Sequence, residues 1–585
     1  MTAAISLLNL VPQEKQSAIL VGVLAVLDKM LAIHRLDQLY TEHKLTGMGK
    51  EEFARTLLGA LNINIEGGDE LQQNIPHHGP LVIASNHPFG GIEGVILAYV
   101  IGQIRPDIKV LANQGLQIFQ ELKDYFIFTN PLSERDPRNG PSLRESLRHV
   151  KHGGALLIFP AGRVSYYQSQ KKRISEHQWN RIVANLVTRT QAHYLAVFVS
   201  GQNSPLFYRL GRIYYRLRML MLPRELLNKR DSNINISASS CIPAKAFRPN
   251  TSDIEQTALQ RVQSYVQDPL WRHTWPSSST LLLQPLIPKV PSAEIKTELA
   301  NLAAEQKLLS YRNLDVYYAY YEQIPQTVRE IARLRELVFR EHDEGSGNAL
   351  DTDDFDKTYT HLFIVERDEG NIIGAYRMGQ SDRLLKMGKQ DPFYLSAMFQ
   401  FSAQFVNRQA PCLEMGRSFL IPAYQNSFQG LLLLWRGIGR FVCQFPQYRT
   451  LYGTVSLSKL YDPRSVSLIQ HALVEPTPNA KAHTPFDFPV SAEIADFARQ
   501  YPLANHLTSL LAGIESDGKD IPILLKHYQK LSAKFHCLGI DSHFNHTPGL
   551  LLSVELAQVP EKLGKLYLGE GWQTYKAYSR NDGMQ

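Results

Sequence analysis

The stretch LVIASNHPFGGIEG, residues 81–94, decides the fold of the first half of the chain. Its four apolar residues 81–84 predict a buried strand, and the apolar run 95–100 that follows predicts a helix. Between the two, Gly90 and Gly91 let the backbone turn without a Cβ penalty. A strand that runs through a glycine turn into a helix is typical of an α/β layer fold.

The same stretch also carries chemistry, because His87 follows the strand and Glu93 lies in the first turn of the helix. The two side chains can therefore face each other across one loop. A histidine oriented by a carboxylate can take a proton from a hydroxyl or amine nucleophile, while the carboxylate stabilises the imidazolium that forms. The alternative is a histidine that only caps or packs in the turn.

A second stretch, ALLIFPAGRVS at residues 155–165, predicts another buried strand that ends in a Pro-Gly turn. This turn presents Arg163 and Ser165. Because catalytic loops of α/β sheets gather at the carboxyl ends of strands, Arg163 is expected on the same edge as His87. Helical stretches alternate with the apolar segments, as an α/β domain requires. The predicted strands are residues 81–84, 108–112, 125–129, 155–159 and 194–200.

The chain has 585 residues and is too long for one core, since a domain usually holds about 100–200 residues. A segment rich in proline and serine, residues 268–291, favours neither helix nor central strand and marks the boundary. We therefore predict a helical N-terminal region at 1–60, an α/β domain at 61–267 and a linker at 268–291. A second domain with a helical lead-in is predicted at 292–585.

The composition, 44% hydrophobic and 20% charged, is that of an ordinary globular protein. The four cysteines lie far apart without a Cys-x-x-Cys or interleaved histidine pattern. We therefore expect no disulfide framework, no metal site and a reducing cytoplasm. The N-terminus lacks the basic and apolar regions of a secretory signal. The apolar run 18–27 is shorter than the roughly 20 residues that cross a bilayer.

The second half of the chain contains an acidic loop, residues 351–356. An EF-hand calcium loop requires glycine at its sixth position and glutamate at its twelfth, where Asp356 and Leu362 stand, so calcium is excluded. Further along, alternation in a predicted strand directs Glu414 and Ser418 to one face. The predicted elements are a helix at 327–340, a hairpin of strands 361–365 and 372–377, a strand at 412–420 and a helix at 431–445.

Residues 60–245 resemble the glycerolipid acyltransferase family, which transfers acyl chains from thioesters to lipid hydroxyls. That family has Asn-His, four residues and Asp, where this chain has Asn86-His87, five residues and Glu93. Its Phe-Pro-Glu-Gly-Thr-Arg motif matches residues 159–164, with Ala161 in place of the glutamate. The resemblance implies that His87 is the catalytic base and Glu93 its orienting acid. It also implies substrate-binding roles for Asn86, Gly90, Gly91, Arg163 and Ser165.

The segment 209–230 holds seven basic residues and one acidic residue, interleaved with leucine, isoleucine, tyrosine and methionine. A basic amphipathic segment of this kind suits an anionic membrane surface. Nucleic acid and a plain solvated helix face are the alternatives. Because the surrounding domain resembles a lipid enzyme, the membrane is favoured over nucleic acid.

Residues 325–475 resemble the acetyltransferase-like superfamily, and within it the branch of autoinducer synthases and ornithine-lipid N-acyltransferases. An amino acceptor must lose a proton before it attacks a thioester, so acidic groups belong beside that carbonyl. The resemblance implies a catalytic role for Glu414. It implies substrate-binding roles for Asp353, Asp356, Arg377, Arg417 and Ser418, with the arginines binding the acceptor carboxylate or the phosphate of the donor.

Residues 424–430 bear on the identity of the acyl donor. They match poorly the loop with which acetyltransferases bind the pyrophosphate of coenzyme A. An acyl carrier protein, whose arm has a single phosphate, is therefore the favoured donor, and acyl-coenzyme A is the alternative co-substrate. No tightly bound cofactor is expected.

The order of the two domains resembles that of fused bacterial ornithine-lipid synthases. It implies that the second domain attaches a 3-hydroxyacyl chain to an amino acid, and that the first esterifies the new 3-hydroxyl. The expected partners are acyl carrier protein, the amino acid, the lyso-aminolipid and the anionic inner face of the cytoplasmic membrane. Two alternatives are a lysophospholipid O-acyltransferase with a regulatory second half and a non-catalytic scaffold. The amino acid stays open among ornithine, glycine, glutamine and lysine.

Overall fold

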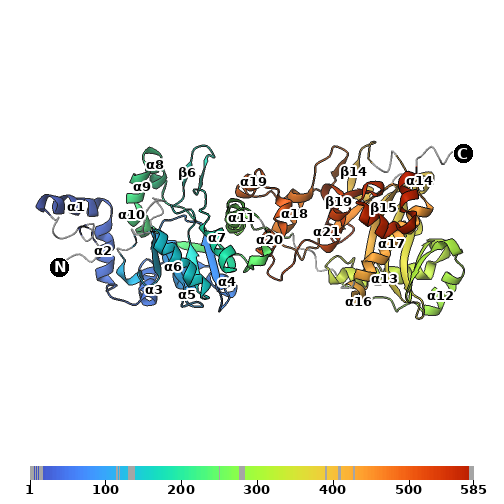
Figure 1. The fold of residues 1–585 in the computed structure, drawn as a ribbon, viewed down its shortest axis with the longest axis horizontal. Helices are drawn as coiled ribbons and strands as arrows, with labels where there is room; N and C mark the ends of the chain where they lie inside the picture. Colours follow the sequence, from blue (N-terminus) through green and yellow to red (C-terminus); the bar gives the residue numbers. More distant parts are fainter. Residues whose placement is uncertain are drawn as a thin grey trace. The chain divides into compact units, whose positions relative to one another are not determined.

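The computed structural model divides into two compact units (Figure 1). The first comprises Met1–Arg272 together with Val490–Asp520, and the second comprises His273–Pro489 together with Ile521–Gln585. The structure describes residues 6, 8, 11, 17–113, 116, 119–129, 139–249, 251–275, 283–388, 392–405, 410–425 and 428–578.

The first unit is built on a seven-stranded sheet of order β1-β9-β8-β2-β5-β3-β4. All neighbouring strands in it run parallel except β8 and β9, which are antiparallel. The predicted α/β class is confirmed. The strands are β1 (Asn64–Glu66), β2 (Leu81–Ser85), β3 (Lys109–Asn113), β4 (Phe126–Thr129), β5 (Ala155–Ile158), β8 (His193–Val199) and β9 (Asn233–Ala238), beside a separate hairpin of β6 (Tyr166–Gln168) and β7 (Arg173–Ser175).

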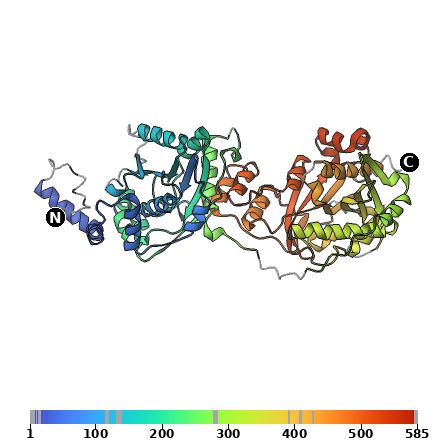
Figure 2. The ribbon, with the colours of Figure 1, turned by 90° about the horizontal axis from the view of Figure 1, so that it is seen from below.

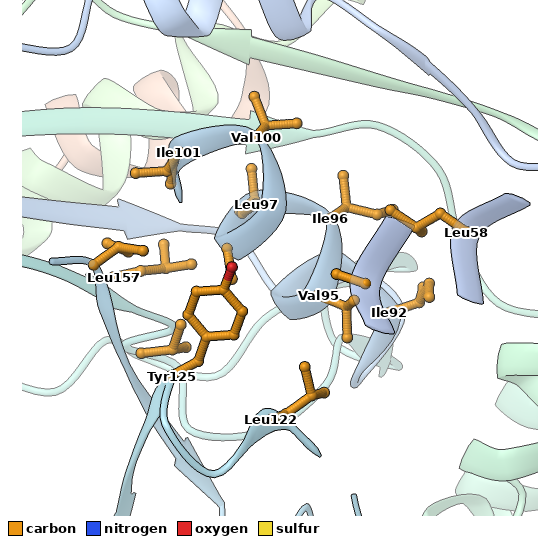
Figure 3. Packing of buried hydrophobic residues seen from close by; sticks show 14 of the residues in the cluster. Leu58, Ile92, Val95, Ile96, Leu97, Val100, Ile101, Leu122, Tyr125 and Leu157 are labelled. Carbon is orange, nitrogen blue, oxygen red and sulfur yellow. The ribbon is translucent and has the colours of Figure 1, made fainter. Parts of the chain in front are cut away.

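Helices lie against this sheet (Figure 2), and most residues of α5 belong to the buried core. The sequence of α5 is apolar on all sides, which is typical of a fully buried helix. Figure 3 shows Ile96 of α5 on the side of Leu58, while Tyr125 and Leu157 lie on the other side of the helix. The helices are α1 (Ala18–Met30), α2 (Ile33–Glu42), α3 (Lys50–Ala60), α4 (Gly68–Gln73), α5 (Ile92–Gly102), α6 (Asn139–Lys151), α7 (Ile182–Thr190), α8 (Pro205–Ile213), α9 (Tyr215–Leu220), α10 (Leu222–Leu227) and α11 (Asp253–Tyr265).

One segment of the first unit comes from the second half of the sequence. Residues Val490–Asp520 carry α19 (Ala492–Ala498) and α20 (Leu507–Ala512), and α19 packs beside α11. Arg173 of β7 pairs with Glu493 at 2.9 Å and with Asp496 at 3.0 Å. The first unit is therefore discontinuous in sequence, whereas the predicted second domain runs unbroken from residue 292.

The second unit is built on an eight-stranded sheet of order β10-β11-β12-β13-β15-β16-β19-β18. Strands β15 and β16 run parallel and pair only from Cys412 to Met415, although both strands continue beyond that point. The predicted hairpin is present as β12 and β13. The strands are β10 (Lys307–Tyr311), β11 (Leu314–Tyr320), β12 (Thr360–Glu366), β13 (Ile372–Gln380), β15 (Cys412–Leu420), β16 (Thr450–Ser456), β18 (Lys534–Asp541) and β19 (Thr547–Glu555), beside a separate pair of β14 (Phe399–Phe401) and β17 (Ala480–Ala482).

The helix predicted at 327–340 is α13 (Pro325–Glu341), and it buries the expected apolar face with Ile331, Leu334 and Val338. The helix predicted at 431–445 is α17, which packs on β11, β12 and β13. Among the described residues, no helix is both long and apolar enough to cross a membrane. The helices of this unit are α12 (Ser292–Ala300), α13, α14 (Ser381–Lys386), α16 (Pro422–Gln425), α17 (Phe428–Gln444), α18 (Pro463–Leu473), α21 (Ile523–Lys530), α22 (Glu561–Leu568) and α23 (Trp572–Ala577).

Candidate active sites

A cleft of about 1620 Å³ opens in the first unit, beyond the carboxyl ends of β2 and β5. Its lining includes His87, Gly90 and Gly91 from the loop after β2, and residues 158–164 from the loop after β5. On another side the lining comes from α19 and the residues that follow it, among them Phe497. The two loops that the sequence singles out therefore meet in one cavity large enough for a lipid-sized ligand.

The imidazole of His87 contacts Glu93 within this cleft, with Nδ1 2.9 Å from Oε1. Glu93 is fully buried, and it accepts hydrogen bonds from the backbone N–H groups of Phe89, Gly90 and Gly91 at 2.8–2.9 Å. Gly90 has a φ of 95°, and a Cβ there would lie 2.6 Å from Leu222. The turn itself therefore fixes the carboxylate that orients His87.

The electrostatics of the pair favour a charged carboxylate and a basic imidazole. Burial alone would raise the pKa of Glu93, but His87 and the backbone N–H groups of Gly90 and Gly91 lower this pKa to about 2. Burial would likewise lower the pKa of His87, yet Glu93 and then Glu176 raise it above its ordinary value. An ionised Glu93 beside a basic His87 suits the acceptance of a proton from a bound hydroxyl.

The backbone of His87 is held by two further side chains. Its N–H donates to Glu176 Oε1, and its carbonyl oxygen accepts from Ser165, through N at 2.9 Å and Oγ at 3.2 Å. Glu176 is buried and also accepts from Trp179 Nε1 at 2.9 Å. Sequence reasoning missed Glu176, because this residue lies outside both motifs and no local pattern distinguishes it.

The predicted residues of this site divide into two groups. His87, Gly90, Gly91 and Arg163 line the cleft, whereas Asn86 does not. The Asn86 amide joins β2 to β8, since Nδ2 donates to the Val199 carbonyl at 2.9 Å and Oδ1 accepts from the Val199 N–H at 2.7 Å. Asn86 therefore positions the strand end that carries His87.

In the second unit, three arginines and three aspartates form a buried network. Arg377 donates to Asp353 at 2.5 Å and to Asp356 at 3.1 Å. Arg335 of α13, which sequence reasoning missed, donates to both oxygens of Asp356 at 2.8 Å. The buried Asp356 would have a raised pKa by desolvation alone, but Arg335 and Arg377 hold this pKa far below its usual range. The network comprises Arg335, Arg377, Arg417, Asp351, Asp353 and Asp356.

Glu414 lies in a closed hydrogen-bond cage. Its Oε1 accepts from the Tyr359 hydroxyl at 2.9 Å and from the Leu395 N–H at 3.3 Å, and its Oε2 accepts from the Tyr452 hydroxyl at 2.8 Å. Burial raises the pKa of Glu414, although these hydrogen bonds oppose the shift. The carboxyl group therefore joins β15 to its neighbours.

A second buried carboxyl group, that of Glu344, lies near the point where β15 and β16 stop pairing. Arg417 follows the paired part of β15 with a φ of 49°, and its Nη2 donates to the Tyr394 hydroxyl at 3.1 Å. Near it lies Glu344, which is only 7% exposed. Burial raises the pKa of Glu344 to about 7, against the opposing effects of Ser456 and Arg417. Sequence reasoning missed Glu344, because the loop after α13 carries no recognisable motif.

Ser418 lies within a register shift between β13 and β15, between Gly416 and Phe419, which interrupts strand alternation. Its hydroxyl contacts Tyr376. The segment 424–430, which matches a coenzyme A loop poorly in sequence, is only partly described, since residues 426 and 427 lie outside the described residues.

Comparison with known proteins yields matches to both halves of the chain. A family model described as "Acyltransferase" matches residues 23–269, and one described as "Acetyltransferase (GNAT) domain" matches residues 334–436. Both resemblances drawn from the sequence are thereby confirmed.

Three characterised relatives share part of the sequence. A glycine N(alpha)-acyltransferase of Bacteroides thetaiotaomicron is 26% identical over 301 residues, which cover 47% of this chain and 87% of that protein. A lyso-glycine lipid O-acyltransferase of Phocaeicola vulgatus is 26% identical, covering 34% of this chain and 70% of that protein. An L-ornithine N(alpha)-acyltransferase of Rhodobacter capsulatus is 30% identical, covering 22% of this chain and 52% of that protein.

Proposed function

We propose that this chain, an acyltransferase with an acyltransferase domain in its first half and an acetyltransferase-type domain in its second, makes an aminolipid by two successive acyl transfers. The second unit attaches a 3-hydroxyacyl chain to the α-amine of an amino acid. The first unit then esterifies the new 3-hydroxyl. Support comes from relatives that are named for each of the two transfers.

The observation that carries the proposal is the His87–Glu93 pair in the cleft of the first unit. In the O-acylation, His87 accepts the proton of the 3-hydroxyl as the oxygen attacks the thioester carbonyl. Glu93 stabilises the imidazolium, which then returns its proton to the departing thiol. Glu176 and Ser165 act as positioning residues, since they hold the backbone of His87 and contact no reacting atom.

In the N-acylation, we assign the proton acceptor to Glu344. Its raised pKa of about 7 is matched to a proton transfer near neutral pH. Glu344 also lies near Arg417 and Ser456, where β15 and β16 separate. Glu414 has its oxygens occupied by two tyrosine hydroxyls and a backbone N–H, so it serves to position β15.

The donor of both transfers is proposed to be an acyl thioester on an acyl carrier protein, with acyl-coenzyme A as the alternative. This proposal rests on the poor match of residues 424–430 to a pyrophosphate-binding loop. Parallel assays of the purified chain with the two donors, each at equal concentration, separate them by kcat/KM.

A membrane surface is proposed as the place of reaction, on the cytoplasmic face. Helices α8 and α9 expose apolar side chains, among them Ile213 at 76%, beside the exposed Arg209 and Arg212. Helix α1 likewise exposes Ile19 at 82%. Exposed apolar side chains next to arginines are suited to an anionic bilayer. Within the predicted basic segment, Arg218 and Lys229 differ because they are buried.

The proposal is tested by supplying purified protein with a 3-hydroxyacyl donor, a second acyl donor and single amino acids. Mass spectrometry should show the N-acyl amino acid first and the diacyl aminolipid later. Esterification of a lysophospholipid alone would support an O-acyltransferase with a regulatory second half. Thioester that stays unconsumed with every acceptor would support a scaffold.

A further inference from the structure

Arg218 of α9 is a buried cation without an acidic partner. The residue is 3% exposed, and its guanidinium lies 4.9 Å from the centre of the Tyr166 ring. In the described part of the chain it forms no ion pair, and its Nε has no hydrogen-bond partner. Burial of an unpaired guanidinium costs free energy, so such a group is usually completed by an anion.

The neighbours of Arg218 add positive charge and lie at the cleft. Tyr166, Arg163 and His177 all line the cleft that contains His87. The His177 ring stacks on Tyr166 with centroids 4.3 Å apart. Burial, and then the charges of Arg163 and Arg218, lower the pKa of His177 to about 4. His177 is therefore neutral at pH 7, and the local charge comes from the two arginines.

The carboxylates in the neighbourhood of Arg218 have hydrogen-bond or ion-pair partners other than Arg218. Glu93 forms an ion pair with His87 and accepts hydrogen bonds from the N–H groups of its own turn, and Glu176 accepts from the His87 N–H and Trp179. Glu225, which follows α9 in sequence, accepts from Ser204. Arg163 has no ion pair among the described residues either. The cluster of Arg163, Tyr166, His177 and Arg218 therefore carries a net positive charge, with Arg163, Tyr166 and His177 in the lining of the cleft and Arg218 packed behind Tyr166.

We propose that Arg218 and Arg163 hold the carboxylate of the acceptor in the O-acylation, so that the acceptor hydroxyl reaches His87. This inference rests on the proposed function. N-acylation converts the amine of an amino acid into a neutral amide, so the acceptor headgroup keeps an α-carboxylate without its α-ammonium. A guanidinium recognises a carboxylate through paired N–H donors, and a charged hydrogen bond of this kind is strong.

The test compares two acceptors with the full-length protein. One is a short-chain N-(3-hydroxyacyl) glycine, soluble without a membrane, and the other is its carboxamide. With the acid, Arg218→Gln should raise KM about 10- to 100-fold, the range expected when a charged hydrogen bond is lost, and should change kcat less. With the carboxamide, the wild-type protein should already show the raised KM, and Arg218→Gln should add little.

Arg189→Gln is the matched control, because Arg189 of α7 is exposed and lies outside the lining of the cleft. This control should keep the wild-type KM for both acceptors. Arg218→Lys should restore part of the affinity for the acid, since it keeps the charge. Equal losses on the acid and the carboxamide, or an unchanged KM, would overturn the carboxylate site.

A second measurement does not depend on turnover. The acid should raise the pKa of His177 on binding, because its carboxylate offsets the two arginines, and the carboxamide should leave this pKa unchanged. NMR of histidine-labelled protein reports this shift, with His177→Gln identifying the signal. No difference between the ligands would contradict the inference. A different result would contradict the proposed function itself: wild-type protein would esterify lysophosphatidic acid and leave the N-acyl amino acid unused.

Discussion

His87 Nδ1 lies 2.9 Å from Glu93 Oε1, and the turn that separates the two residues is the same turn that binds the carboxylate. Both oxygens of Glu93 accept backbone N–H groups of residues 89–91. The glutamate is thus held rigidly without any residue from outside the motif. Although the acid is shifted by one position relative to the family motif, it still contacts His87, because the longer side chain folds back onto its own loop.

Glu93→Gln should move the acid limb of the pH profile for O-acylation. His87 must be neutral to accept a proton, so activity is lost as the pH falls through its raised pKa. Removing the charge of Glu93 lowers that pKa, and the acid limb should shift to lower pH. The plateau of kcat/KM should fall by about 10- to 100-fold, because the imidazolium is no longer stabilised. An acid limb at the wild-type pH would contradict the assigned pairing.

Glu344→Gln should suppress N-acylation by about 10²- to 10⁴-fold, the usual effect of losing a positioned general base. In the wild type, Glu344 must be ionised, so N-acylation should decline as the pH falls below about 7. This decline of N-acylation at low pH should be absent in the variant, while O-acylation of a supplied lyso-aminolipid persists. A variant that keeps wild-type N-acylation would remove Glu344 from the mechanism.

The same substitution should stabilise the fold. A carboxyl group with a raised pKa binds its proton more tightly when folded, so its ionisation destabilises the protein as pH rises from about 4.5 to about 7. Glutamine avoids this cost, and Glu344→Gln should gain roughly 3 kcal/mol of stability at pH 8 and little at pH 4. Denaturant unfolding at the two pH values measures the difference. Equal stability of both proteins at pH 8 would contradict the raised pKa.

Glu414→Gln should behave differently from Glu344→Gln. One of the two tyrosine hydroxyls that donate to Glu414 would face the new NH₂ group, so the second unit should lose about 1–3 kcal/mol of stability. N-acylation should fall, but its acid limb should stay at the wild-type pH. O-acylation should be unaffected. If instead the acid limb of N-acylation disappears in Glu414→Gln and stays in Glu344→Gln, then Glu414 is the proton acceptor and Glu344 is the positioning residue.

Membrane binding should depend on both charge and exposed apolar area. Replacing both Arg209 and Arg212 by glutamine in one variant should weaken binding to anionic vesicles about 30-fold, since each arginine contributes about 1 kcal/mol near such a surface. The residual binding should be less sensitive to salt. Ile213→Ser should weaken binding to neutral vesicles as well, because it removes apolar area. If vesicle flotation is unchanged in both variants, the segment is only a solvated helix face.

Local patterns predict much of this structure. Period-2 and 3.6 periodicities depend on neighbouring residues, and they correctly predict β2, α5, the β12–β13 hairpin and α13. The contact between His87 and Glu93 can be predicted from the sequence because both residues lie in the same short stretch of the chain. The spacing of apolar residues likewise places Arg163 on the same sheet edge as His87.

Other features depend on contacts that are distant in sequence. Glu176 reaches His87 across 89 residues, and Arg335 reaches Asp356 across 21. A charged side chain such as Arg218 is expected to be exposed to solvent, but in α9 it is buried against the ring of Tyr166. No composition shift marks Val490–Asp520 as part of the first unit. Burial and pairing of these groups follow from tertiary packing, which the sequence pattern does not encode locally.

The most direct measurement of the central claim is the product distribution of His87→Ala. The purified variant should form the N-acyl amino acid at the wild-type rate, and the second acylation should fall by about 10²- to 10⁴-fold. His152→Ala, which changes an exposed histidine at the end of α6, should make both products normally. Mass spectrometry of lipids should then show the monoacyl intermediate without the diacyl lipid. Normal diacyl lipid from a folded His87→Ala protein would show that the His87 loop is only a structural turn.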